Sequence, residues 1–262
     1  MNQWSKRRKR IILFLILFIL VFLIGVPIFF LFYKTPTCLD GRQNGDEIGV
    51  DCGGSCQLLC TAESLPLIIK GDPRVLKVAT STFEIVVLVN NPNNNGEIYR
   101  AGYTFKLYDT TNIIPIKTID GETFIPKGTT FAVFEGPFIL EEGIIPTRAT
   151  FEWKEGGLVW QRNTTQIPKI KATDIRFSRE DTNPRLDALI ENTSLENVHN
   201  IDLVALISNE TGSIFAASKT FVDMLSSGEK VSVVFTWPKP FDKKIFTTNI
   251  IIRILPDRSF IQ

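Results

Sequence analysis

The chain has 262 residues and a net charge of +1, from 29 Lys and Arg against 28 Asp and Glu. Basic residues form no patch outside the N-terminal tail, which argues against a nucleic-acid partner. With 20 Phe and a single His, the composition favours packed β-structure over a metalloenzyme, and we expect no cofactor and no enzymatic activity.

The first predicted element is a transmembrane helix over residues 11–33. Twenty of the 22 residues from Ile11 to Phe32 are Ile, Leu, Phe or Val. A helix of that length rises about 33 Å, enough to cross a hydrocarbon core of about 30 Å. A basic tail over residues 1–10 precedes it, so the positive-inside rule predicts a cytoplasmic N-terminus and an extracytoplasmic remainder at the cell membrane.

The alternative to this anchor is a cleaved signal peptide. Such a peptide has an apolar core of roughly 7 to 15 residues, followed by a cleavage site made of small residues. Here the apolar run is longer and ends in IFFLFY, with no small residues. We therefore predict a single-pass anchor that contacts the lipid bilayer through Ile11–Phe32.

A small cysteine-rich neck is predicted over residues 34–63. An even number of cysteines in an oxidising compartment indicates two disulfides, with three possible pairings. The segment has too few apolar residues for a core of its own, so we expect covalent links to replace one. The expected disulfide residues are Cys38, Cys52, Cys56 and Cys60.

Two metal alternatives remain open for the neck. The four cysteines could form a zinc site, although their spacing differs from the usual C-x-x-C pairs. Hard oxygen ligands for calcium also occur there, although their order does not match an EF-hand loop. These weak calcium candidates are Asp40, Asn44, Asp46, Glu47 and Asp51.

The neck resembles a short cysteine motif, C-x-DG-x-x-NG-x-E-x-GVDCGG-x-C-x-x-C, that recurs beside anchors and domains of bacterial and archaeal surface proteins. The match runs from Cys38 through the segment 49–54 to Cys56, and the spacing to Cys60 is one residue longer. The resemblance implies an extracytoplasmic module and no particular activity.

A first β-sandwich is expected over residues 64–165. Short apolar runs such as 83–91 and 103–108 are separated by turn-rich segments, which is typical of a two-sheet sandwich. The run FKLYD at 105–109 resembles the signature of FxLYD-type domains. That resemblance implies an Ig-like sandwich akin to the late-embryogenesis-abundant fold, used for binding or structure, with no catalytic residues to transfer.

A second β-sandwich is expected over residues 166–262, because the pattern of the first recurs at a shift of about 100 residues. Residues 89–93, VNNPN, correspond to residues 190–194, IENTS. The FxLYD residues are lost in the second copy, so its membership depends on the pattern alone. Residues 161–168 are the expected linker, which is short enough to restrict the mutual orientation of the sandwiches.

Candidate catalytic residues are few. His199 is the only histidine, no nucleophile motif such as G-x-S-x-G accompanies it, and we expect a surface loop residue. The acidic pairs at 141–142 and 180–181 are expected in solvated turns rather than in a glycosidase site. Three asparagines begin N-x-[ST] acceptor sequences: Asn163, Asn192 and Asn209.

The tryptophans outside the tail are expected in the core or at a domain junction, namely Trp153, Trp160 and Trp237. Trp237 lies in a WPKPF segment whose prolines indicate an edge or a strand exit. It is therefore the best candidate for an exposed aromatic contact.

These patterns predict an all-β protein with two tandem Ig-like β-sandwiches after one N-terminal transmembrane helix and the neck. We expect a non-enzymatic interaction or envelope-structural module with a protein partner at the cell envelope. The alternatives are a calcium-dependent surface binding module that uses the neck, and a stress-protective structural protein.

Overall fold

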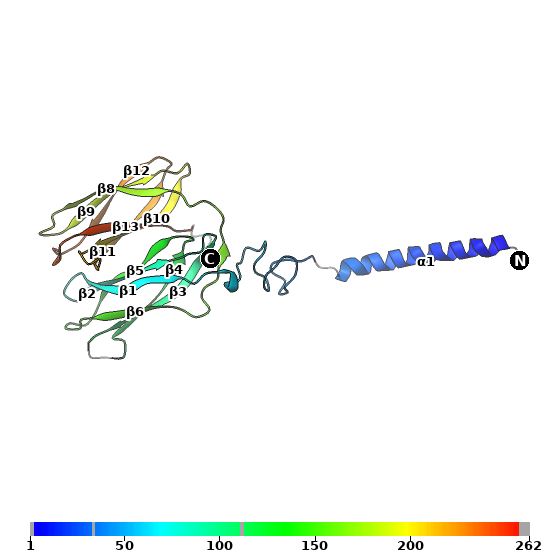
Figure 1. The fold of residues 1–262 in the computed structure, drawn as a ribbon, viewed down its shortest axis with the longest axis horizontal. Coiled ribbons are helices and arrows are strands. Elements are labelled where there is room, and N and C mark those ends of the chain that lie inside the picture. The colour runs from blue at the N-terminus through cyan, green and yellow to red at the C-terminus, as the bar shows by residue number, and fades with distance from the viewer. Residues whose placement is uncertain (1–2, 33–34, 111–112, 257–262) are drawn as a thin grey trace.

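The computed structural model describes residues 3–32, 35–110 and 113–256 and confirms the all-β fold after one N-terminal helix. The helix α1 spans Gln3–Phe32 and stands away from the remainder of the chain (Figure 1). It begins inside the basic tail rather than at residue 11, because Lys and Arg are good helix formers and nothing interrupts them. Residue 33, the last of the predicted helix, lies outside the described residues.

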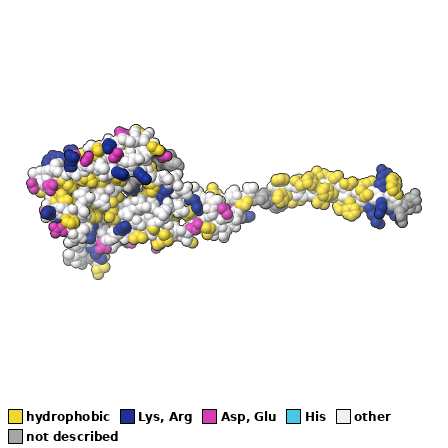
Figure 2. All heavy atoms as spheres, turned by 45° about the horizontal axis from the view of Figure 1, so that its top comes forward, with side chains coloured by type: hydrophobic (Ala, Val, Ile, Leu, Met, Phe, Trp, Pro, Cys, Tyr) yellow, Lys and Arg dark blue, Asp and Glu magenta, His cyan; other side chains and the backbone are white. Residues whose placement is uncertain are grey.

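The surface of α1 is apolar along most of its length. The most apolar 18-residue window within its segment Lys6–Leu31 has a mean hydropathy of 3.4 and no buried part, and the basic side chains gather at the N-terminal end of the helix (Figure 2). By length and composition this helix can cross a membrane.

The first sandwich contains seven strands in two antiparallel sheets. One sheet has the order β1-β2-β5 and the other β4-β3-β6, with the short β7 added to β3. The strands are β1 (Ile68–Lys77), β2 (Thr82–Asn90), β3 (Gly96–Tyr108), β4 (Lys117–Ile125), β5 (Thr130–Ile139), β6 (Arg148–Trp153) and β7 (Gln161–Arg162).

The second sandwich contains six strands with the orders β12-β9-β8 and β11-β10-β13. Its sheets therefore follow the same connection plan as the first, strand for strand apart from β7. The strands are β8 (Ile170–Ser178), β9 (Arg185–Asn192), β10 (Val198–Ser208), β11 (Ile214–Leu225), β12 (Lys230–Thr236) and β13 (Thr247–Ile254).

Each sandwich has its own core between its two sheets. In the first, Ile85 on β2 and Phe131 on β5 pack against Phe105 on β3, and all three are fully buried. In the second, Leu186 and Phe235 pack in the same way against Leu203. Alternation along the strands directs these side chains inward, as a two-sheet fold requires.

A third apolar cluster joins the two sandwiches. Sheet β1-β2-β5 packs its outer face against the outer face of sheet β11-β10-β13 (Figure 1). Strands β2 and β10 are consequently covered on both faces, which explains their continuous apolar runs, since a half-exposed strand would alternate. The buried members are Leu76, Val86, Ala132, Val204, Leu206 and Ala217.

The expected linker at 161–168 is partly wrong. Gln161 and Arg162 form β7 and pair with Glu97 and Gly96 of β3, so the first sandwich extends to residue 162. A two-residue strand has too few residues to leave a periodic pattern in the sequence.

Candidate functional site

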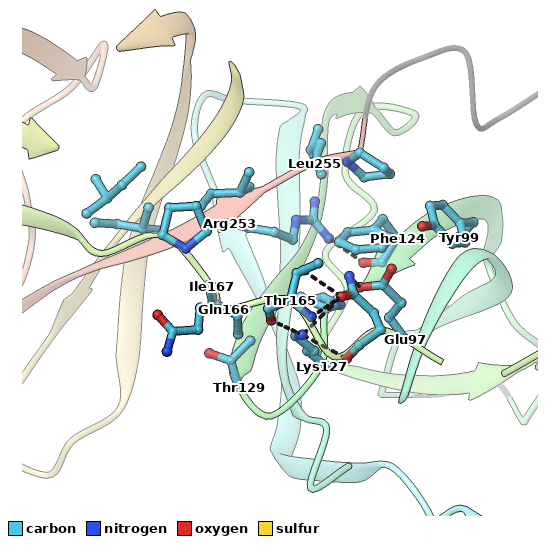
Figure 3. A pocket seen from close by; sticks show the side chains of 17 residues that line it. Glu97, Tyr99, Phe124, Lys127, Thr129, Thr165, Gln166, Ile167, Arg253 and Leu255 are labelled. Atoms are coloured by element: carbon cyan, nitrogen blue, oxygen red, sulfur yellow. Dashed lines mark hydrogen bonds between the residues drawn. The ribbon is translucent and has the colours of Figure 1, made fainter. Parts of the chain in front are cut away.

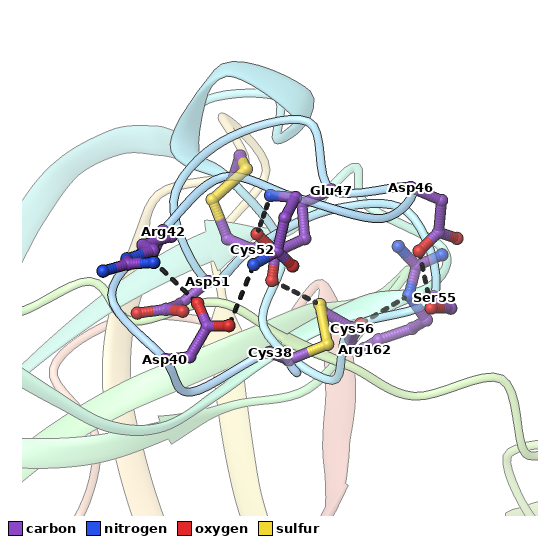
Figure 4. Close-up of a disulfide and its surroundings, with 12 residues drawn as sticks. Cys38, Asp40, Arg42, Asp46, Glu47, Asp51, Cys52, Ser55, Cys56 and Arg162 are labelled. Atoms are coloured by element: carbon purple, nitrogen blue, oxygen red, sulfur yellow. Dashed lines mark hydrogen bonds between the residues drawn. A yellow bond between two sulfur atoms is a disulfide. The ribbon is translucent and has the colours of Figure 1, made fainter. Parts of the chain in front are cut away.

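The structure pairs all four neck cysteines. Cys38 is bonded to Cys56 and Cys52 to Cys60, with Cα–Cα distances of 5.6 and 5.1 Å (Figure 4). The expectation of two disulfides is confirmed, and the structure selects one of the three pairings. The zinc alternative fails because no cysteine keeps a thiolate for a metal.

The neck is fixed to the first sandwich rather than suspended from it. Leu59 is buried in the first core, and its backbone N–H donates to the Trp160 carbonyl at 3.0 Å. Gln57 and Arg162 exchange two further bonds at 2.7 Å. Gly96 lies beneath this contact, where an added Cβ would come within 3.1 Å of Leu59 Cδ1.

The predicted calcium ligands are held in separate turns. Asp40 accepts from Asn44 Nδ2 at 2.8 Å, and this bond is the main cause that lowers the pKa of Asp40. Asp51 accepts from the Gly41 N–H at 3.0 Å, while Asp46 accepts from Ser55 Oγ on the other side of the neck (Figure 4). Asp40 and Asn44 are therefore in direct contact, but among the described residues no three of these carboxylates lie close enough together to hold one ion.

Glu47, the remaining carboxylate candidate, faces a disulfide. Its Oε2 accepts from the Asn44 N–H at 3.1 Å, and its Oε1 lies 3.6 Å from Cys56 Sγ. Among the described residues, Cys38, Glu47 and Cys56 form the only group of three such side chains close enough to hold an ion. Both sulfurs belong to the disulfide, so this group offers a single carboxylate.

A buried ion cluster lies where the sandwiches meet. Arg253 on β13 and Asp202 on β10 are 9% and 2% exposed, and their side chains meet at 2.7 Å. Lys219 on β11 approaches the other Asp202 oxygen at 3.1 Å. These two cations compensate the one buried carboxylate.

Arg253 also crosses to the first sandwich. Its Nη1 donates to Thr123 Oγ1 at 2.7 Å and to the Phe124 carbonyl at 3.2 Å, both on β4. The guanidinium lies 5.7 Å from the ring of Phe131 in the first core. This side chain therefore bonds the two sandwiches as well as the ion cluster, which fixes their relative orientation.

A cavity of about 500 Å³ opens beside Arg253 at the connection between the sandwiches (Figure 3). Asn163 bridges its two buried charges: it donates to Glu97 Oε2 at 2.9 Å and accepts from Lys127 Nζ at 3.1 Å. Lys127 also donates to the Thr165 carbonyl, and burial lowers its pKa. The chain satisfies these groups itself, so they fix the connection rather than offer a reactive centre.

A second cavity of about 640 Å³ lies at the other end of the junction. Residues at the end of β1, the start of β11 and the segment 237–243 form its walls. Trp237 lies in the core, as expected for the tryptophans outside the tail, and only its choice as the best candidate for an exposed contact is wrong: it is 7% exposed, and its Nε1 donates to the Ala217 carbonyl at 2.8 Å. Pro238 and Pro240 do follow the end of β12, but the segment that contains them folds back so that Trp237 and Phe241 pack on the second core.

The structure also places the other residues that the sequence singled out. His199 is exposed as expected, but on β10 opposite Met224 rather than in a loop, because β10 extends through the predicted turn. The acidic pairs at 141–142 and 180–181 are exposed in turns. Trp160 is buried and Trp153 packs against the first core, in agreement with their expected place.

Two buried asparagines were missed as structural anchors. Asn91 Nδ2 donates to the carbonyls of Gly96 and Pro126, and Asn192 Nδ2 donates to those of Glu196 and Leu225. Asn91 directly follows β2, and Asn192 is the last residue of β9. The correspondence of VNNPN with IENTS was the available signal, since both segments place an Asn at the end of an apolar strand.

No model of a known protein family matches the chain, and no curated protein matches it. The likeness of residues 105–109 to the FxLYD signature therefore stays a prediction from the residue pattern.

Proposed function

We propose that the protein is a single-pass, membrane-anchored extracytoplasmic module that holds two sandwiches in a fixed orientation for an interaction at the cell envelope. The observation that carries this proposal is the continuous set of contacts from neck to junction: a stapled neck inserts Leu59 into the first core, and Arg253 bonds the second sandwich to the first. A flexible tether would need neither contact.

Two further observations support the location. The basic residues precede the apolar helix, as the positive-inside rule requires for an anchor with an outer C-terminal part. Both disulfides lie in the segment that follows the helix, and disulfides persist in oxidising compartments.

We also propose that the two sandwiches are two copies of one FxLYD-like plan. The shared strand order and the shared asparagine anchors support this proposal. A protective role without a discrete partner remains the alternative. The calcium alternative is not pursued, because the acidic side chains of the neck are engaged in separate turns.

The proposal is tested by cross-linking the full chain in its native membrane. The comparison is a shortened chain of residues 1–63, which keeps anchor and neck but lacks the sandwiches. We expect a discrete, saturable protein adduct with the full chain alone. Equal adducts with both chains, or none with either, would contradict the interaction role and favour the protective one.

A further inference from the structure

The cavity at the far end of the junction is unusual in its charges. Four cations line it: Arg74 and Lys77 at the end of β1, and Lys239 and Lys243 in the segment that follows Trp237. Two acids line it as well, Glu84 on β2 and Asp242 beside Lys243. The lining therefore carries a positive excess.

These four cations have no ion-pair partner among the described residues. Elsewhere on the sandwiches some exposed cations meet a carboxylate, as Arg100 does with Glu122 at 2.9 Å, whereas others such as Lys70 form no ion pair in the described chain, so it is the gathering of four such cations around one opening that distinguishes the cavity. Like charges around one opening repel each other, and a negative ligand would relieve that repulsion.

The lining of this cavity is more polar than apolar, and three aromatic side chains form a large part of its apolar share. Phe241 packs edge-on against Phe215 and Trp237, with ring centroids 5.5 and 5.2 Å apart. The indole of Trp237 is buried and its N–H is already bonded, so no flat aromatic face is available to stack on a sugar ring. An extended peptide, in contrast, alternates its side chains and can present carboxylates to the rim and apolar groups to the wall.

We propose that this cavity is a binding site for an acidic, partly apolar peptide segment of a partner protein. The proposal rests on the interaction role proposed above and names the partner's chemistry. Strand β1 leaves the neck and runs away from α1 (Figure 1), so its last residues place the site at the end remote from the anchor. A partner on the outer side of the envelope can reach that position.

The test uses the full chain in lipid nanodiscs and a fluorescein-labelled peptide of alternating Glu and Leu. The decisive variant is K77Q/K239Q/K243Q, which removes three rim charges. The matched control is K70Q/K169Q/K171Q, which removes three exposed charges outside the cavity. We expect saturable binding that weakens with salt, a loss of tenfold or more in the rim variant, and little change in the control.

Three outcomes would overturn this assignment: equal loss in both variants, absence of peptide binding at 0.15 M salt, or binding of polygalacturonate in preference to the peptide. Thermal unfolding of both variants checks that the fold is kept, and R74Q provides an independent single change if the triple variant unfolds. If the peptide does not bind at this cavity but the full chain still forms a discrete cross-linked adduct in its native membrane, this inference alone is refuted and the interaction role stands.

Discussion

Asp202 and Glu84 are both acids placed where the two sandwiches meet, but they differ in their compensation. Asp202 meets two cations, Arg253 and Lys219. Glu84 has no ion-pair partner among the described residues, and burial raises its pKa to about 7. The two carboxyl groups thus have opposite effects at the junction. Asp202 holds a cation that bonds both sandwiches, whereas ionised Glu84 destabilises the folded chain because its charge is partly desolvated.

Removal of the Asp202 charge is expected to weaken the whole junction. In Asp202→Asn, Arg253 stays buried without its carboxylate, and breaking a buried pair costs about 3 to 5 kcal/mol. Urea unfolding of the full chain in detergent, followed by Trp fluorescence, measures this loss. Asp174→Asn, in an exposed pair with Arg176 at 3.8 Å, is the control, with an expected change within about 0.5 kcal/mol. Equal effects of the two changes would contradict the assignment.

Glu84 is expected to make stability depend on pH. Its pKa in the folded chain, about 7, lies above the ordinary value of 4.5, so between these pH values the folded chain binds a proton that the unfolded chain releases. The free energy of unfolding therefore falls as pH rises from about 4.5 through 7. The charges lining the same cavity are Arg74, Lys77, Lys239, Asp242 and Lys243. None of them forms an ion pair with Glu84 in the described chain.

The measurement is the unfolding midpoint at pH 5 and pH 8. Glu84→Gln should reduce the difference in unfolding free energy between pH 5 and pH 8 by an amount on the order of 1 to 2 kcal/mol, after allowance for solvent screening. The exposed Glu142→Gln should leave the difference between the two pH values as it is in the original chain. An unchanged pH dependence in Glu84→Gln would show that this carboxylate is better solvated than its position indicates.

At the scale of elements, each sandwich has a buried asparagine at corresponding positions of its second-strand turn, Asn91 in the first and Asn192 in the second. Asn192 is fully buried. Its amide group donates to the Glu196 carbonyl in the β9–β10 turn and to the Leu225 carbonyl at the end of β11, while its Oδ1 accepts from the Ser194 N–H at 3.0 Å. This engagement also leaves no room for a glycan on Asn192, although the residue begins an N-x-[ST] sequence. The sequence alone cannot distinguish an N-x-[ST] asparagine that accepts a glycan from one that is buried as a structural anchor.

Asn192→Ala is expected to destabilise the second sandwich by about 2 to 4 kcal/mol, because several backbone groups lose their partner inside the protein. Asn209→Ala, in the partly exposed turn before β11, should cost less than about 1 kcal/mol. Hydrogen exchange of β9 and β12 in the full chain locates the effect. Comparable losses for both variants would mean that Asn192 is not the anchor of its turn.

Sequence reasoning succeeded where a property is carried by adjacent residues and failed where it depends on residues far apart. The apolar run of α1 and the strand patterns are local, so their elements were predictable. The contact between the outer faces of β2 and β10 was not predictable, because a continuous apolar run is equally typical of a strand inside a single core. Arg253 and Asp202 are separated by 51 positions, and nothing in the sequence marks them as partners. Trp237 was placed in the core correctly but was also named as the best candidate for an exposed contact, because the prolines after it indicate a strand exit without its direction.

At the scale of the molecule, the structure combines an apolar helix, a stapled neck and two sandwiches that share a junction (Figures 1 and 2). The neck enters the first core, and the junction contains both an apolar cluster and a buried ion cluster. Each contact removes a degree of freedom between successive parts. The central claim is therefore that the two sandwiches behave as one rigid body.

The most direct test is the distance between spin labels at positions 155 and 196, one on each sandwich, measured by pulsed electron resonance on the full chain in nanodiscs. Both positions are exposed, and labels introduced through an unnatural amino acid leave the four disulfide cysteines intact. The rigid junction predicts a single narrow distance distribution that broadens in Asp202→Asn. A broad or multiple distribution in the unaltered chain would show that the sandwiches move independently and would contradict the proposed fixed orientation.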